Sequence, residues 1–165
     1  TRWMPEFGRE YWERNQVDRR LTPAQLEEIA VGHLAREDAL LLEANRWLFA
    51  DTNALTTLVF AHAYHGHAPP GLERLAEACA TRYALTFVCA DDVPYDDTWD
   101  RSGPGDRAVM QRRLLAELAV RRIPYRVLRG DLDARREALG DLDGPEIARP
   151  EARLVGDRAD EVRRA

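Results

Sequence analysis

An aspartate that directly follows a short apolar run, Trp47–Ala50, is the residue of this chain best placed to do chemistry. Such a run is typical of a buried parallel strand, and α/β proteins bind their ligands at the carboxyl ends of such strands. The Asp51 carboxylate could therefore hold Mg²⁺ or accept a substrate proton. The alternative is structural, because an acid or amide here would also cap the next helix. The polar residues expected in the same crevice are Thr52, Asn53, Thr56 and Thr57.

A group of charged residues lies near the N-terminus, where Glu6 and Glu10 flank Gly8 and Arg9. A glycine permits a close approach of the backbone to a ligand, and the Arg9 guanidinium matches the geometry of a phosphate or a carboxylate. The simpler interpretation is a cluster of ion pairs on the surface, and these residues taken alone favour it.

A long acidic loop is expected over residues 91–105, directly after the apolar strand expected at residues 83–89. Aromatic side chains among acids suit a planar cationic ligand, because the face of a ring attracts cations. Arginines beyond them could close over transferring phosphates as a lid. The alternative is an exposed acidic loop that leads into a helix at Asp106. The arginines concerned are Arg101, Arg107, Arg112 and Arg113.

Three histidines, His62, His65 and His67, could suggest a zinc site. The sequence around them offers no close acidic or cysteine partner, and Gly66 with Pro69 marks the end of a helix. Basic side chains at the C-terminus of a helix interact favourably with its dipole. We therefore expect a helix end here rather than a metal site.

The 165 residues are enough for one domain with a substantial core. A net charge of −5 argues against sequence-independent binding to nucleic acid or to an anionic membrane. No apolar run approaches the ~20 residues that span a bilayer, and no signal peptide is visible, so we expect a cytoplasmic protein. All 24 basic residues are arginine. Because the chain begins with Thr rather than Met, we also expect it to be a fragment.

Predicted helices alternate with short apolar strands, which indicates a parallel sheet built from βαβ units. The clearest helix start is Thr22-Pro23, with Gln25 in the capping-box position, and this helix should run to about Ala44. Residues 6–11 are expected to form a loop that leads into a helical turn. The expected strands are 2–5, 47–50, 83–89 and 125–128, and the other expected helices are 56–64, 71–80, 106–121 and 131–139.

Five short blocks follow one another in a recognisable order between residue 4 and about residue 139. The blocks are Pro5–Tyr11, Phe49–Thr57, Tyr64–Gly66 with Pro69, Val93–Asp97 with Arg101-Ser102, and Ile123–Tyr125. In this order they resemble the ribosylnicotinamide kinase domain of NadR-type proteins, a P-loop kinase family. Asn53 departs from the family pattern, which often has Asp at this position.

The resemblance implies ATP-dependent phosphorylation of the 5′-hydroxyl of nicotinamide riboside, with Mg²⁺ as a cofactor. It implies that Asp51 acts at the substrate hydroxyl or the metal, that Tyr95 stacks on the nicotinamide ring, and that Arg101 belongs to a lid. We predict two catalytic residues, Asp51 and Arg101. The predicted substrate-binding residues are Glu6, Arg9, Thr52, Asn53, Thr56, Thr57, Tyr64, Tyr95 and Asp97, and the predicted cofactor-binding residues are Arg107 and Arg112.

The Gly-x-x-x-x-Gly-Lys-Ser/Thr loop of this family should precede Glu6 by about one βα unit, and this chain does not contain it. We therefore expect a three-layer P-loop kinase-like α/β fold, a parallel sheet flanked by helices, that lacks its first βα unit. It should occupy residues 1–140, followed by a peripheral tail over 141–165. The alternatives are another P-loop ATPase or nucleoside kinase, or a non-catalytic nucleotide- or metabolite-binding module. A second copy or a fused adenylyltransferase domain are possible partners.

Overall fold

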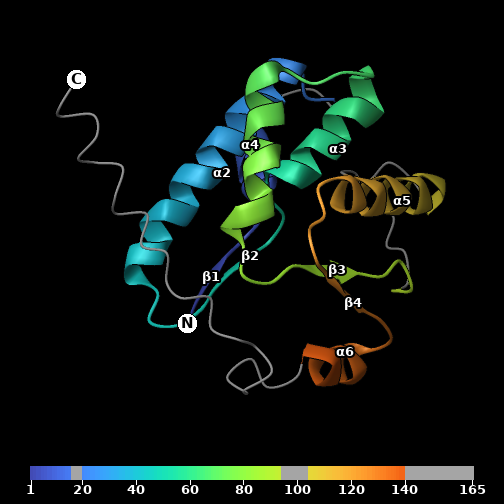
Figure 1. Ribbon diagram of the computed structural model, residues 1–165. Helices are drawn as coiled ribbons and strands as arrows, with labels where there is room; N and C mark the ends of the chain where they lie inside the picture. The colour runs from blue at the N-terminus through green and yellow to red at the C-terminus, as the bar shows by residue number, and fades with distance from the viewer. Residues whose placement is uncertain (16–19, 94–103, 140–165) are drawn as a thin grey trace. The chain divides into compact units, whose positions relative to one another are not determined.

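The computed structural model in Figure 1 describes residues 1–15, 20–93 and 104–139. The strands are β1 (Arg2–Met4), β2 (Leu48–Ala50), β3 (Phe87–Cys89) and β4 (Arg126–Leu128). The helices are α1 (Phe7–Asn15), α2 (Pro23–Glu43), α3 (Ala54–His65), α4 (Pro70–Arg82), α5 (Pro104–Val120) and α6 (Leu132–Leu139). The predicted alternation of helices and strands is therefore confirmed over most of the chain.

The chain divides into two compact units, Thr1–Val127 and Leu128–Ala165. The first unit contains every predicted site residue that the structure describes. The predicted boundary at residue 140 stays a prediction, because the residues that follow it lie outside the described part of the chain.

The start of α2 is confirmed as a capping box. The Thr22 hydroxyl accepts a hydrogen bond from the Gln25 backbone N–H at 3.3 Å, and the Gln25 side chain accepts one from the Thr22 N–H at 2.8 Å. Two backbone donors that a helix start leaves without partners are thereby satisfied. The helix ends at Glu43, one residue before the predicted end.

The loop predicted over residues 6–11 is wrong, because α1 begins at Phe7. The reason is a tertiary contact that no local pattern reveals. A Cβ at Gly32 would lie 2.5 Å from Cζ of Phe7, so the absence of a side chain at Gly32 lets α1 approach α2. The guanidinium of Arg36 lies 4.6 Å from the centre of the Phe7 ring. Two further polar contacts join the helices, Glu10 with Arg36 and Tyr11 with Glu28.

The strands β1 and β2 pair in parallel, with Met4 opposite Ala50. Helix α2 contacts both strands, and Met4 is fully buried. On the other face, Trp3 is 67% exposed and its cross-strand partner Phe49 is 36% exposed. The predicted parallel strand at residues 47–50 is confirmed, but its predicted burial is wrong, because Leu48 and Ala50 are only half-buried and Phe49 is exposed.

The strands β3 and β4 form a second two-stranded sheet, and the Arg126 N–H donates to the Thr86 carbonyl at 3.0 Å. The predicted strand over residues 83–89 is shortened to its last three residues. Across the described residues, no strand joins the two pairs. The mixed α/β class is thus confirmed, whereas a continuous three-layer sheet stays a prediction.

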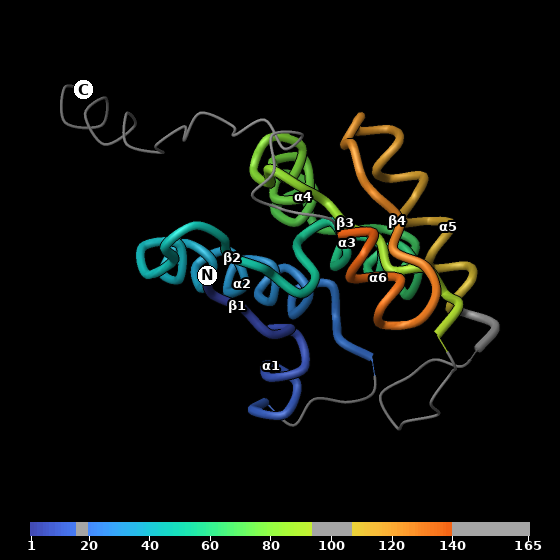
Figure 2. Tube along the Cα trace, turned by 90° about the horizontal axis from the view of Figure 1, so that it is seen from below, coloured from blue at the N-terminus to red at the C-terminus, as the bar shows by residue number. Residues whose placement is uncertain are grey.

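The main core lies among the helices of the first unit. Helix α3 contacts α2, α4 and α5, and Figure 2 shows it between α2 and α5. Gly66 ends α3 in the left-handed conformation, with φ of 74°, which a glycine adopts without steric cost. Within the described ranges, none of the helices is both long and apolar enough to cross a membrane. The most buried side chains of the core include Leu55, Leu58, Leu72, Ala76 and Leu118.

Candidate functional site

The turn between β2 and α3 contains Asp51, for which the sequence allows two roles, ligand binding or capping of the next helix. Asn53 is the N-cap of α3, and its Oδ1 accepts hydrogen bonds from the N–H groups of Leu55 at 3.0 Å and Thr56 at 3.3 Å. Asp51 therefore does not cap the helix. Its side chain is exposed, and within the described residues its carboxylate has neither a hydrogen bond nor an ion pair. A carboxylate in this state is available to a ligand.

Thr52 connects these two residues in a strained conformation. Its φ of 66° lies in the left-handed region, which costs a residue other than glycine about 1–2 kcal/mol. Ladder pairing fixes the backbone before it, since the Asp51 N–H donates to the Met4 carbonyl at 3.0 Å. Backbone strain of this kind is concentrated at functional sites, where the surrounding structure maintains it. The geometry thus supports a site at this turn.

Glu6 and Arg9 lie at the same edge as Asp51. Because β1 and β2 run in parallel, the residues that follow Met4 and those that follow Ala50 emerge at the same end of the pair. Glu6 and Arg9 form an ion pair at 4.0 Å, and the side chain of Arg9 is more than half exposed. Among the predicted site residues, Glu6 and Arg9 are therefore placed by the structure at the same edge as Asp51.

The two threonines of the first turn of α3 have different surroundings. Thr57 is buried, and its hydroxyl donates to the Asn53 carbonyl at 3.3 Å, so it supports the turn itself. Thr56 is half-buried, and its N–H is held by the cap. Of the two predicted hydroxyls, that of Thr56 is the one without a hydrogen bond to another described residue.

Tyr64 lies at the opposite end of α3 from Asp51. Twelve residues of α-helix span about 18 Å, so the structure does not bring these two side chains together. The Tyr64 ring packs 5.6 Å from that of Phe60, and the guanidinium of Arg20 lies 5.8 Å from its centre. A role for Tyr64 in substrate binding therefore remains a prediction without a geometric link to the turn.

The predicted lid is only partly described. Arg107 of α5 donates through Nη1 to the Val93 carbonyl at 2.7 Å, which ties the loop after β3 to this helix. Arg112 is exposed on the same helix. The remaining three residues lie outside the described part of the chain, so their roles stay predictions: Tyr95, Asp97 and Arg101.

The histidines at the end of α3 make ordinary contacts. His62 Nε2 lies 3.2 Å from a carboxylate oxygen of Glu73, and His65 Nε2 lies 2.8 Å from the Leu21 carbonyl oxygen. The described residues contain no group of three or more His, Cys, Asp or Glu side chains that could hold a metal ion. A Mg²⁺ ion at the turn between β2 and α3 would receive one carboxylate ligand from the described residues, that of Asp51. It would need other oxygen ligands such as water or phosphate.

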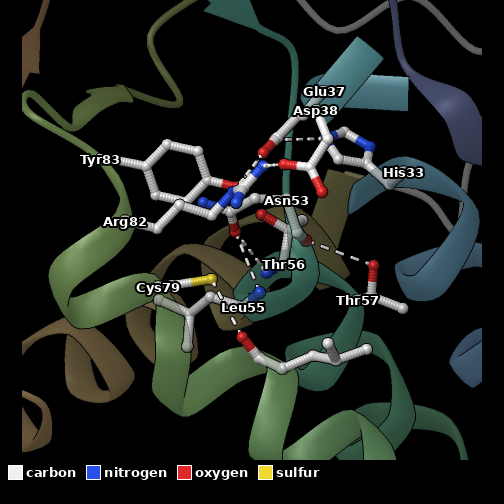
Figure 3. Close-up of polar contacts among 11 residues, drawn as sticks. His33, Glu37, Asp38, Asn53, Leu55, Thr56, Thr57, Cys79, Arg82 and Tyr83 are labelled. Carbon is white, nitrogen blue, oxygen red and sulfur yellow. Dashed lines mark hydrogen bonds and ion pairs between the residues drawn. The ribbon is translucent and has the colours of Figure 1, made fainter. Parts of the chain in front are cut away.

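A buried polar cluster that the sequence analysis missed lies beside the start of α3. Figure 3 shows the carboxylate of Glu37 surrounded by His33, Arg82 and Tyr83. Burial alone would raise the pKa of Glu37, but the hydrogen bonds from these three residues outweigh it, and the pKa is lowered. Burial and the Glu37 charge raise the pKa of Tyr83 well above its usual value. The available signal was a His and a Glu four residues apart on the apolar face of α2.

Parallel strands, one helix that covers a face of the β1–β2 pair, and an exposed acid at its carboxyl edge are features of α/β proteins that bind ligands at that edge. A family model described as an AAA domain matches residues 1–135, and the chain belongs to this family of P-loop nucleotide-binding domains. The match does not distinguish ribosylnicotinamide kinases from other members. A comparison with curated proteins finds no match.

Proposed function

We propose that this chain belongs to a phosphotransferase that converts nicotinamide riboside to its mononucleotide with ATP and Mg²⁺. The observation that carries the proposal is the exposed carboxylate of Asp51, at the carboxyl end of a parallel strand in a chain of the AAA domain family. Asp51 would accept the proton of the 5′-hydroxyl or ligate Mg²⁺. The specific substrate rests on the ordered sequence blocks described above.

The residues of this chain could bind the Mg²⁺ ion of ATP·Mg²⁺ but not its phosphates. Asp51 and the neighbouring hydroxyl of Thr56 offer the hard oxygen atoms that Mg²⁺ prefers. The chain has neither a lysine nor a Gly-x-x-x-x-Gly-Lys-Ser/Thr loop, so it supplies no cradle for the phosphates. We propose that a phosphate loop outside this sequence completes the site.

The open sheet supports this part of the proposal. Two-stranded sheets are marginal in water, and parallel strands are usually covered on both faces. Here β1 and β2 form a pair with an apolar, exposed face that contains Trp3 and Phe49. An added strand and helix would extend the pair and cover these rings. This is what a missing βα unit predicts.

A second candidate is a nucleotide- or metabolite-binding module without catalytic activity. The observation that favours it is the same absence of lysine from the chain. Such a module would bind a nucleoside or nucleotide at the Asp51 edge without turnover.

A panel of nucleosides separates these possibilities. The protein is produced together with any residues that its gene encodes before Thr1, and ATP consumption is measured with nicotinamide riboside, adenosine, cytidine and uridine. We expect the highest kcat/KM with the cationic nicotinamide base. Turnover with another nucleoside, but not with nicotinamide riboside, would assign a different substrate. Binding without any turnover would favour the non-catalytic module.

A further inference from the structure

Glu37 is a carboxylate buried in the middle of α2, with 2% of the residue exposed. Its Oε1 accepts a hydrogen bond from the Tyr83 hydroxyl at 2.8 Å and lies 3.0 Å from His33 Nε2. Its Oε2 accepts one from Arg82 Nε at 2.6 Å. Burying an ion costs several kcal/mol, and well-packed apolar residues often replace such a network without loss of stability. Stability alone therefore does not explain the network.

The donors to Glu37 come from the end of α4. Arg82 is the last residue of this helix and Tyr83 is its C-cap residue. Arg82 also reaches the next carboxylate along α2, with Nη2 at 2.7 Å from Asp38 Oδ1. The network thus fastens the end of α4 to the middle of α2, directly before the chain enters β3.

Cys79 extends this connection to α3. It lies one turn before Arg82 and is 3% exposed. Burial raises the pKa of the Cys79 thiol, the backbone N–H of Leu55 lowers it, and the charge of Glu37 raises it. Cys79 and Leu55 belong to the same buried core cluster, and Figure 3 shows Cys79 beside Leu55 at the start of α3.

The first turn of α3 needs support from its surroundings, because the strained Thr52 and the cap residue Asn53 precede it. Strained backbone persists only where neighbouring structure determines its conformation. We propose that Glu37 is a positioning residue for this turn: by fastening the end of α4 to α2, it fixes the surface against which Leu55 packs. The proposal concerns the geometry of the turn and holds whatever reaction the protein performs.

Amide hydrogen exchange of the full 165-residue chain tests the proposal by comparing the two ends of α3. The variant is Glu37→Gln, and the matched control is Glu43→Gln, an exposed carboxylate on the same helix that pairs with Arg2. We expect Glu37→Gln to lower protection at Leu55 and Thr56 by at least ~10-fold more than at Gly66, since it weakens hydrogen bonds to a charged group. Glu43→Gln should leave this ratio unchanged.

A merely structural role gives a different pattern. It would lower protection equally at both ends of α3, and this result, or no change at Leu55, would overturn the proposal. If Glu37→Gln does not fold, Tyr83→Phe provides the same test, because it removes one donor and leaves the other two. We expect a loss of about threefold at Leu55 relative to Gly66 in that variant, and an unchanged ratio would equally contradict the proposal.

Discussion

At the scale of single residues, Asp51 and Asn53 divide two tasks that one acid could perform at the end of a strand. Asn53 caps α3 with two hydrogen bonds, so the exposed Asp51 carboxylate at the edge of the sheet is not used as the cap. The sequence could predict a polar strand end but not this division, because both residue types are good caps. The left-handed conformation of Thr52, the residue between Asp51 and Asn53, is visible only in the structure.

Replacing Asn53 with alanine removes both cap hydrogen bonds. We expect the free energy of unfolding to fall by about 1 kcal/mol, the usual effect of losing an N-cap. Urea denaturation of the variant and the parent measures this difference. Asn53→Asp, which retains an acceptor, serves as the control and should stay close to the parent. An Asn53→Ala variant with undiminished stability would show that the cap contributes nothing.

Glu37 gives stability a dependence on pH. Its pKa in the folded protein lies below the ordinary value of 4.5, so its ionised form stabilises the fold above that pH. This contribution is lost as the pH falls through the lowered pKa. We expect Glu37→Gln to be less stable than the parent at pH 7 and the difference to shrink toward pH 3. Urea denaturation at several pH values measures it, and a difference that grows in acid would contradict this assignment.

At the scale of elements, the helices α2 to α6 correspond to helices predicted from the sequence, whereas α1 does not. The capping box at Thr22 predicts the start of α2 from the local sequence, without reference to any tertiary contact. Helix α1 has no such signal, and its contacts with α2 through Phe7 and Gly32 lie far apart in sequence. A prediction from local pattern cannot include that packing, so it described α1 as a loop. The same reasoning explains why the buried network around Glu37 was missed.

Gly32→Ala tests the packing of α1 on α2. Alanine favours a helix by up to about 1 kcal/mol, but its Cβ would lie 2.5 Å from the Phe7 ring, and overpacking costs about 1–3 kcal/mol. We expect a net loss of stability, measured by thermal unfolding, and its relief by Phe7→Leu in the double variant. Gly71→Ala is the control, because the atom nearest its Cβ is the flexible end of Glu27. A stabilised Gly32→Ala variant would contradict the described contact.

At the scale of the whole molecule, the mixed α/β class could be predicted from the alternation of helices and strands, and membership in the AAA domain family agrees with it. The continuity of the sheet could not be predicted, because it depends on strand pairing between distant segments. The structure instead has two separate strand pairs across its described residues. In the β1–β2 pair, Trp3 and Phe49 form an exposed apolar face.

The most direct measurement of the central proposal is the turnover of nicotinamide riboside by the Asp51→Asn variant of the protein extended upstream of Thr1. If Asp51 acts at the reacting hydroxyl, its loss should lower kcat by about 10²–10⁴-fold. The control is Asp133→Asn, an exposed aspartate on α6 that should keep full activity. An Asp51→Asn variant that keeps the parent's kcat would contradict the proposed role of this carboxylate.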